Sequence, residues 1–295
     1  MTRKGTGRER SSDRSAATIP LRYAADVRTI VLLAVLTALF VVQYARVVAH
    51  PALLASTYAF VLVPLVAKHN HIHCQTFRGR RWNAAFSMWL TLLTGMTTTG
   101  VITAHNRLHH GHNQSQDDPV RCSLVRFGDN RLNLVAFFFA STFTMWRNRP
   151  DDLAEWRVTR PALHRQAIVE RIAVTAFVMA LLAYDWRSAL TVFVGPWLFG
   201  QWFLVTINLL QHQDCDPASS HNHSRNITGR AINWFLLNNG YHTAHHNFPG
   251  AHWSELPAVH RTLLPAIDPA LNERSLLICT WRRFIAGERW SDGRG

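Results

Sequence analysis

Several common catalytic and binding motifs are missing from this sequence. Its four cysteines include no CxxC pair, which argues against a zinc knuckle, a rubredoxin site and a ligated iron–sulfur cluster. There is no GxGxxG dinucleotide fingerprint, no HExxH protease helix and no Glu-x-x-His pair of the kind that soluble di-iron bundles carry. Acidic residues are also scarce, with 18 Asp and Glu against 31 Lys and Arg.

Positive charge and apolar residues are what the sequence has in excess. The net charge is +13, and hydrophobic residues make up 48% of the 295 residues. Such a basic chain is often a nucleic-acid-binding protein, but here the charges lie at the ends of long uncharged runs. That placement fits the anionic face of a membrane, so we expect a bilayer and no nucleic acid among the partners.

Four apolar runs predict membrane-spanning helices, arranged as two hairpins. The third run is shorter than the roughly 20 residues of a usual span, so it needs neighbouring residues in order to cross. The runs are Thr29–Ala45, Pro51–Ala67, Ile172–Tyr184 and Ser188–Gln211. The sequence therefore predicts an all-α integral membrane helical bundle of about four transmembrane helices, with interfacial helices beside them.

The two ends of the chain are expected to lie outside this bundle. Residues 1–27 predict a disordered basic tail, residues 28–262 the membrane domain, and residues 263–295 an interfacial or cytosolic tail. Lys and Arg gather at one end of the predicted hairpins, which favours a cytoplasmic position for both termini. We expect a multi-pass protein of a bacterial inner membrane.

Two further apolar segments leave alternatives open. Trp82–Ala104 is long enough to cross, but if it did, the histidines before and after it would lie on opposite faces of the membrane. If those histidines form one site, the segment must instead re-enter or lie in the interface. Leu132–Trp146 is aromatic-rich and short for a crossing.

The 17 histidines gather where apolar segments meet polar ones. Residues four apart share one face of a helix, so His69 with His73, and His105 with His109, are each expected to chelate one ion. His71 leaves a second choice in the first cluster, the pair His71 and His73, but helical spacing favours His69 and His73.

Adjacent histidines point in different directions. Neighbours on an α-helix lie about 100° apart, so they tend to face different ions. His109 with His110, and His245 with His246, are two such pairs. The clusters therefore predict a site for two metals rather than one crowded ion.

Ligand type alone does not choose the metal, because imidazole suits Fe, Zn, Cu and Ni. No carboxylate lies inside the clusters, which favours redox chemistry on a lipid-like substrate over hydrolysis. A membrane metal carrier is the rival outside enzymes, although three of the predicted spans hold no acidic residue or histidine. Hydrogen-bonded or interfacial roles remain the simpler interpretation of the other histidines, which are His71, His112, His221, His223, His252 and His260.

At this point the sequence resembles the membrane fatty acid desaturase and hydroxylase superfamily, whose signature is three histidine boxes of the forms HX3-4H, HX2-3HH and HX2-3HH. The matching stretches are 69–73, 105–110 and 242–246, and an Asn and a His four apart, Asn208 and His212, precede the last box. The resemblance implies metal ligation by His69, His73, His105, His109, His110, His212, His242, His245 and His246, with Asn208 acting through water. His71, His112 and His223 are weaker candidates.

The resemblance also implies an activity. Two irons facing the cytosol would use O2 to desaturate a fatty-acyl chain, or to hydroxylate a lipid or specialised metabolite on the same scaffold. No cofactor-binding motif or HPGG haem motif is present, so electrons are expected from a separate ferredoxin-like or rubredoxin-like donor. Thr91–Thr103 and Phe137–Phe139 are candidate walls of the substrate tunnel.

Overall fold

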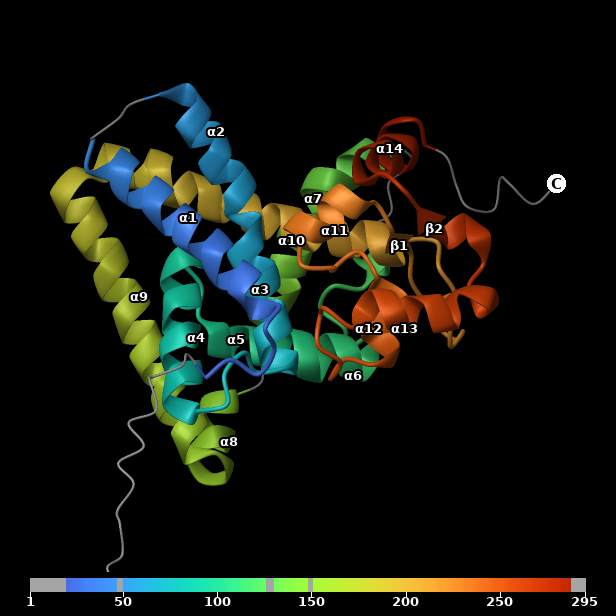
Figure 1. Cartoon of the computed structure of the whole chain (residues 1–295), viewed down its shortest axis with the longest axis horizontal. Coiled ribbons are helices and arrows are strands. Elements are labelled where there is room, and N and C mark those ends of the chain that lie inside the picture. Colours follow the sequence, from blue (N-terminus) through green and yellow to red (C-terminus); the bar gives the residue numbers. More distant parts are fainter. Residues whose placement is uncertain (1–19, 47–49, 126–129, 148–150, 288–295) are drawn as a thin grey trace, which may run out of the picture.

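The computed structural model describes residues 20–46, 50–125, 130–147 and 151–287, and its regular structure is almost entirely helical (Figure 1). Most of the predicted basic tail and the last residues of the predicted C-terminal tail lie outside the described residues. Long helices fill one side of the molecule, and short helices with two very short strands form the other (Figure 1).

Three helical stretches among the described residues are long and apolar enough to cross a membrane, and one bent pair would make a fourth. The first is α1 (Asp26–Tyr44), and the second joins α2 (Pro51–Phe60) to α3 (Leu62–His73). Together these two stretches contain the two apolar runs of the first predicted hairpin, Thr29–Ala45 and Pro51–Ala67, with nearly the same bounds. Buried leucines of α1, including Leu33 and Leu36, pack into the main hydrophobic core with Val61 and Val63.

The third stretch covers 161–212 and is broken at Asp185, whose backbone leaves the helical region at φ −154° and ψ 90°. It consists of α9 (Pro161–Ser188), the π-helix η3 (Ala189–Val194) and α10 (Gly195–His212). The predicted third span, Ile172–Tyr184, covers only part of α9, which already begins at Pro161. Proline is suited to the first turn of a helix. The added turns remove the shortfall in length.

The segment between the first two histidine boxes is a bent pair, not one straight helix. The helix α4 (Arg80–Thr94) and the helical stretch Thr98–His112 meet at 88°. At the bend, Gly95 adopts φ +64°, and a Cβ there would lie 2.4 Å from the ring of Trp197. Only glycine fits this combination of backbone angle and close approach, so the chain turns at Gly95.

Two buried charged side chains satisfy the polar backbone at that bend. The ammonium of Lys68 donates to Thr94 Oγ1 and to the carbonyl of Met96. On the other side, the carboxylate of Glu170 accepts hydrogen bonds from the backbone N–H of Thr99 at 2.9 Å and from its hydroxyl at 2.8 Å. Irregular backbone inside a membrane protein requires such partners, so Lys68 and Glu170 stabilise the break.

The predicted short segment 132–146 is part of α7 (Asn130–Arg147), which is not among the candidate spans. It packs against α10 along one side. Five large apolar side chains, spaced along one face, are exposed: Leu132, Val135, Phe139, Phe143 and Trp146.

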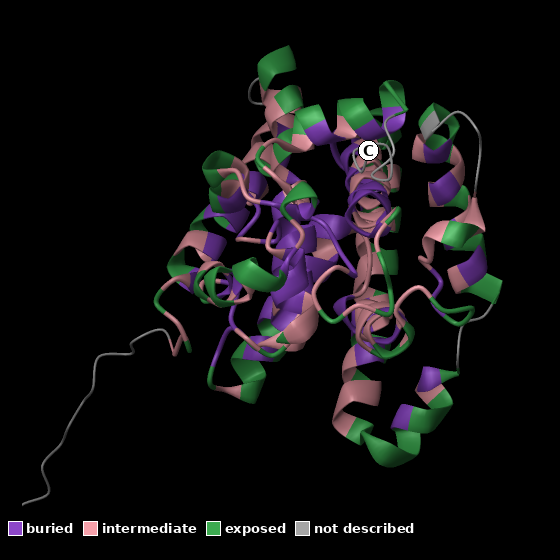
Figure 2. Cartoon of the chain, turned by 90° about the vertical axis from the view of Figure 1, so that its right-hand side faces the viewer, coloured by how far each residue is buried: buried purple, intermediate pink, exposed green. Residues whose placement is uncertain are grey.

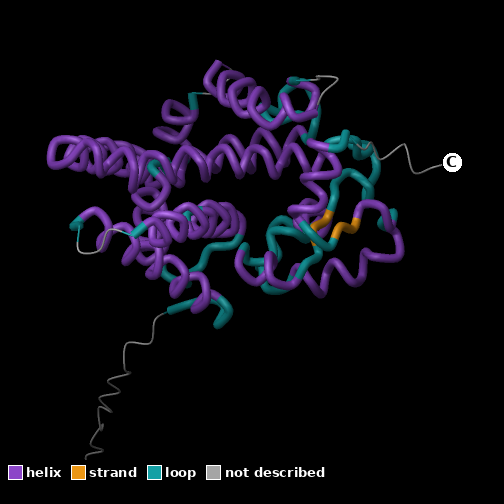
Figure 3. Tube along the Cα trace, turned by 90° about the horizontal axis from the view of Figure 1, so that it is seen from above, coloured by secondary structure: helices purple, strands orange, loops and turns teal. Residues whose placement is uncertain are grey.

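Most of the short elements after α10 form the smaller end of the molecule (Figure 1). The two-residue strands β1 (Asn226–Ile227) and β2 (Asn272–Glu273) pair in parallel there (Figure 3). Seen from this end, the buried residues gather in the middle of the molecule (Figure 2). Phe284 and Cys279 are fully buried in a second core with Phe137, so the segment after residue 263 packs into the fold. The elements not yet given are α5 (Thr98–Val101), η1 (Ile102–His109), α6 (His110–His112), η2 (Cys122–Leu124), α8 (Asp152–Thr159), α11 (Arg230–Phe235), α12 (His242–Asn247), α13 (Leu256–Leu263), η4 (Leu264–Ala266), η5 (Pro269–Leu271), α14 (Leu276–Thr280) and η6 (Trp281–Ile285).

Candidate metal centre

Eight histidines from four separate chain segments converge in two groups, each with ligand nitrogens that all lie within 4.8 Å of one another. The segments are the end of α3, the helix η1, the end of α10 and the helix α12. The first group is His69, His73, His105 and His245, and the second is His109, His212, His242 and His246.

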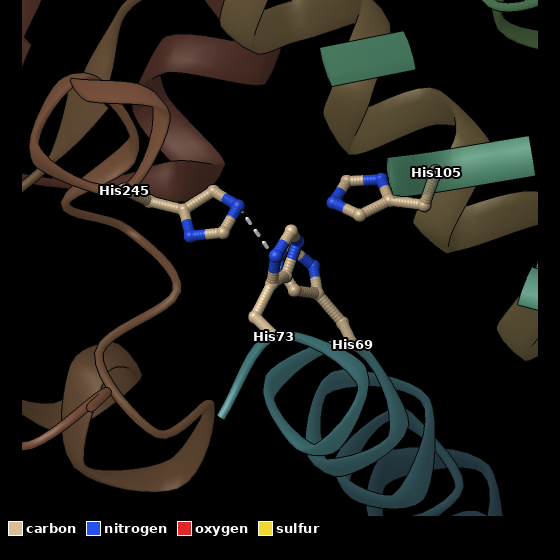
Figure 4. A group of neighbouring side chains, drawn as sticks. All are labelled: His69, His73, His105 and His245. Carbon is tan, nitrogen blue, oxygen red and sulfur yellow. Dashed lines mark hydrogen bonds between the residues drawn. The ribbon is translucent and has the colours of Figure 1, made fainter. Parts of the chain in front are cut away.

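The first box behaves as helical spacing predicts. His69 and His73 lie on one face of α3 with ring centroids 5.3 Å apart, and both rings face His105 and His245 (Figure 4). His71 points elsewhere: its Nδ1 lies 3.0 Å from Thr76 Oγ1. The structure therefore favours the pair His69 and His73 over the pair His71 and His73.

The second box differs from the prediction. His105 and His109 belong to different groups, although they are four residues apart. The segment η1 is a π-helix, whose wider turn also brings residues five apart toward one face. His105 is thus paired with His110, with 3.1 Å between their Nε2 atoms.

His110 extends the first group. Its Nε2 also lies 3.0 Å from Nε2 of His245. His245 in turn lies 2.8 Å from Nε2 of His69. Five imidazoles therefore surround the first position, compared with four at the second.

The third box and the end of α10 complete the second group. His242 and His246 are four apart on α12, and their Nε2 atoms are 3.1 Å apart. Nε2 of His212 lies 2.9 Å from Nε2 of His242. Adjacent histidines serve different groups in both boxes, as predicted: 109 with 110, and 245 with 246.

The ring nitrogens fit metal ions better than they fit one another. Nε2 of His110 approaches two other Nε2 atoms, but Nε2 of a neutral imidazole either donates one hydrogen bond or accepts one, so it cannot satisfy both contacts. Nε2 of His73 and of His109 is buried without any hydrogen-bond partner. Converging, unsatisfied imidazole lone pairs of this kind form a ligand set for first-row transition metals.

The protonation of the third box agrees with this role. Burial lowers the pKa of His242, His245 and His246 well below the ordinary value, and the neighbouring histidines lower it further. These imidazoles are neutral at pH 7, and a neutral imidazole is the form that ligates a metal.

A cavity of about 270 Å³ reaches the histidines from the side of α7 and α10. His69, His105, His109 and His242 form its end. Apolar side chains make up most of its remaining wall: Leu65, Met96, Val101, Ala104, Val120, Phe138, Met145, Leu204, Val205 and Ile207. The site therefore combines two clusters of metal ligands with a largely apolar chamber.

The model of the family described as Fatty acid desaturase matches residues 44–274 of this chain. The chain belongs to this family. Comparison with curated proteins gave no match. As a member of the fatty acid desaturase family, the protein is a desaturase-type or hydroxylase-type oxidoreductase, and its apolar helices are those of a membrane protein.

In this desaturase-family site, Asp118 orients one histidine of the second group. Its Oδ2 lies 2.9 Å from Nδ1 of His109, and both side chains are buried. The N–H of His109 Nδ1 donates to the carboxylate, which leaves Nε2 free for a metal. The sequence prediction did not include Asp118, because it lies eight residues beyond the second box, in a polar stretch without helical periodicity.

The Asn–His pair of α10 lies where the second group meets the cavity. Nδ1 of His212 donates to the carbonyl of His223 at 3.1 Å, so its Nε2 faces the other histidines. Asn208 lines the cavity, and its amide donates to the carbonyl of Val120 at 3.2 Å. Its predicted action through a water stays a prediction.

Two weaker predictions can be placed. His112 is partly exposed, lies 3.9 Å from Asp117 and belongs to neither group.

The predicted tunnel walls are correct only in part. Phe138 lines the cavity, whereas Phe137 is buried in the second core and Phe139 is exposed.

Proposed function

We propose that the protein is an O2-dependent, di-iron membrane oxidoreductase that introduces a C=C bond into an unactivated acyl chain. The observation that carries this proposal is the pair of histidine groups at the end of an apolar cavity. Two irons bound there would supply the redox chemistry, with O2 as the oxidant that removes hydrogen from C–H bonds.

The stoichiometry of the overall reaction shows what the protein must bind and exclude. One –CH2–CH2– unit, one O2, two electrons and two protons give one –CH=CH– unit and two waters. The chain must therefore hold an acyl segment beside the histidines and keep bulk water away from it. Val101, Ala104 and Leu65 supply apolar wall next to His69 and His105, which suits an alkyl segment and excludes water.

The exposed face of α7 supports a substrate from the membrane. Phe138 and Met145 of this helix line the cavity, while Phe139 and Phe143 are exposed on its outer side. An apolar face of this size is expected to lie against lipid, beside the candidate span α10. We therefore propose an acyl lipid as the substrate and the bilayer as its source.

Electrons must come from a separate protein. The exposed residues Arg78, Arg80 and Arg81 follow the first box directly. They offer a basic surface for an acidic ferredoxin-like or rubredoxin-like donor on the cytoplasmic side.

The test combines metal analysis with product analysis. The full chain, made under iron-replete conditions and purified in detergent, is expected to hold about two irons. His109→Ala, from the second group, and His245→Ala, from the first, are each expected to lose iron, and the double variant to lose both ions. Wild-type protein with reductant and O2 should convert an acyl lipid to a product two mass units lighter.

Each alternative has its own result. A gain of 16 mass units would make the protein a hydroxylase on the same scaffold. Stoichiometric zinc without iron, or metal movement across vesicles without any oxidised product, would contradict the oxidoreductase and favour a metal carrier.

A further inference from the structure

His223 is a buried histidine beside the second group, and no histidine box includes it. It lies in the loop between α10 and β1 and is only 5% exposed. Its ring centroid lies 5.4 Å from that of His246, which is close to the 4.9 Å between the rings of His212 and His246. His223 is thus in ring contact with one member of the second group, only slightly farther away than the members are from each other.

The hydrogen bonds of His223 determine its tautomer. Nδ1 lies 3.1 Å from the carbonyl of Ser219, and a carbonyl only accepts, so the proton is on Nδ1. Nε2 then carries a lone pair. That atom is buried and has no hydrogen-bond partner, as is also the case for Nε2 of His73 and His109. A buried acceptor without a partner calls for a bound ion or water.

The position of His223 differs from that of Asn208. Asn208, His109 and His242 line the cavity, whereas His223 and His246 do not. His223 is therefore not part of the cavity wall, whereas Asn208 is. With His110, which contacts His105 and His245, five imidazoles lie around the first position, and the second group has four.

We propose that Nε2 of His223 is a further protein ligand of the ion held by the second group. This inference rests on the proposed function, because it requires a metal there. A fifth nitrogen gives both positions the same number of imidazoles and leaves the cavity side of the second position, where Asn208 lies, open to small molecules.

Three substitutions separate ligation from packing. His223→Ala removes the ring. His223→Asn keeps an N–H donor in the place of Nδ1, able to bond to Ser219, but has no atom in the place of Nε2. His223→Gln provides an amide group near the place of Nε2. His221→Ala, in the same loop and without a ring contact to either group, is the matched control.

The measurement is Fe2+ binding by the full-length protein in detergent, followed under anaerobic conditions by metal analysis and by Mössbauer spectroscopy. The expected result for Ala and Asn alike is a second-site affinity weakened on the order of 10- to 100-fold, with the signal of one iron altered. Imidazole added to His223→Ala should restore occupancy, and His221→Ala should match the wild type.

Other results would overturn the inference. If His223→Asn keeps wild-type affinity and spectrum, His223 acts only through its hydrogen bond to Ser219. If all three variants bind two irons like the wild type, Nε2 is not a ligand, and the proposed function stands without it. If the wild type itself binds no iron, the proposed function fails, and this inference fails with it.

Discussion

His105 and His110 face each other with 3.1 Å between their Nε2 atoms because the helix that carries them is wound as a π-helix. In a regular α-helix, residues five apart point about 140° from each other, so they could not share an ion. The wider π turn brings His110 to His105, while His109 belongs to the second group. One box thus supplies both metal positions.

The first prediction concerns His110. Because its Nε2 contacts only members of the first group at hydrogen-bond distance, His110→Ala should reduce iron from about two to about one per chain. His112→Ala, two residues later and partly exposed, is the control and should keep both irons. Metal analysis of the purified variants measures this, and equal loss in both variants would contradict the π-helical pairing.

The second prediction concerns the buried carboxylate behind His109. Asp118→Asn keeps the shape of the side chain but removes the charge that orients the imidazole, so metal affinity at the second position should fall about 10- to 100-fold. Asp117→Asn changes the neighbouring exposed carboxylate, whose side chain is 76% exposed, and should have no effect. Competition against a chelator of known affinity gives both values.

The third prediction concerns the bend between α4 and α5. Gly95→Ala places a Cβ 2.4 Å from Trp197 in a left-handed backbone conformation, which should destabilise the protein by about 2 kcal/mol or more. The unfolding temperature in detergent should fall by several degrees. Gly250→Ala, where a Cβ would meet no atom within 4 Å, should leave it unchanged. A stable Gly95→Ala variant would show that the bend adapts.

The fourth prediction concerns the electron donor. Reversing the exposed charges with Arg78→Glu, Arg80→Glu and Arg81→Glu should raise the KM for an acidic donor protein and reduce the salt dependence of turnover. The kcat with a small chemical reductant should not change, because the reversed charges face solvent and not the cavity. Unchanged kinetics with the donor protein would place its docking site elsewhere. Arg261→Glu, another exposed arginine, is the control.

Much of the fold could be predicted from hydropathy and spacing. The run Thr29–Ala45 agrees with α1 to within three residues, because an uncharged run of that length has few alternatives to a spanning helix. The pair His69 and His73 follows from ordinary helical periodicity, which α3 retains up to its last turn. The separation of His245 from His246 follows from the same rule.

Other features depended on tertiary contacts that a sequence pattern does not contain. The π-helix of the second box cannot be read from residue types, since helical propensities do not distinguish the two windings. The contact of Asp118 with His109 arises from a turn without periodicity. The sharp bend at Gly95 is set by Trp197, a residue more than a hundred positions away in the chain.

The alternation of adjacent histidines between the two groups has a mechanical consequence. Residues 109 and 110, and again 245 and 246, are joined by single peptide units, and successive Cα atoms are about 3.8 Å apart whatever the surroundings. These two covalent links therefore limit how far apart the two histidine groups can lie, in addition to the packing of the helices. Substitutions in the cavity wall can therefore change the length or bulk of the substrate that fits, without changing these two links between the histidine groups.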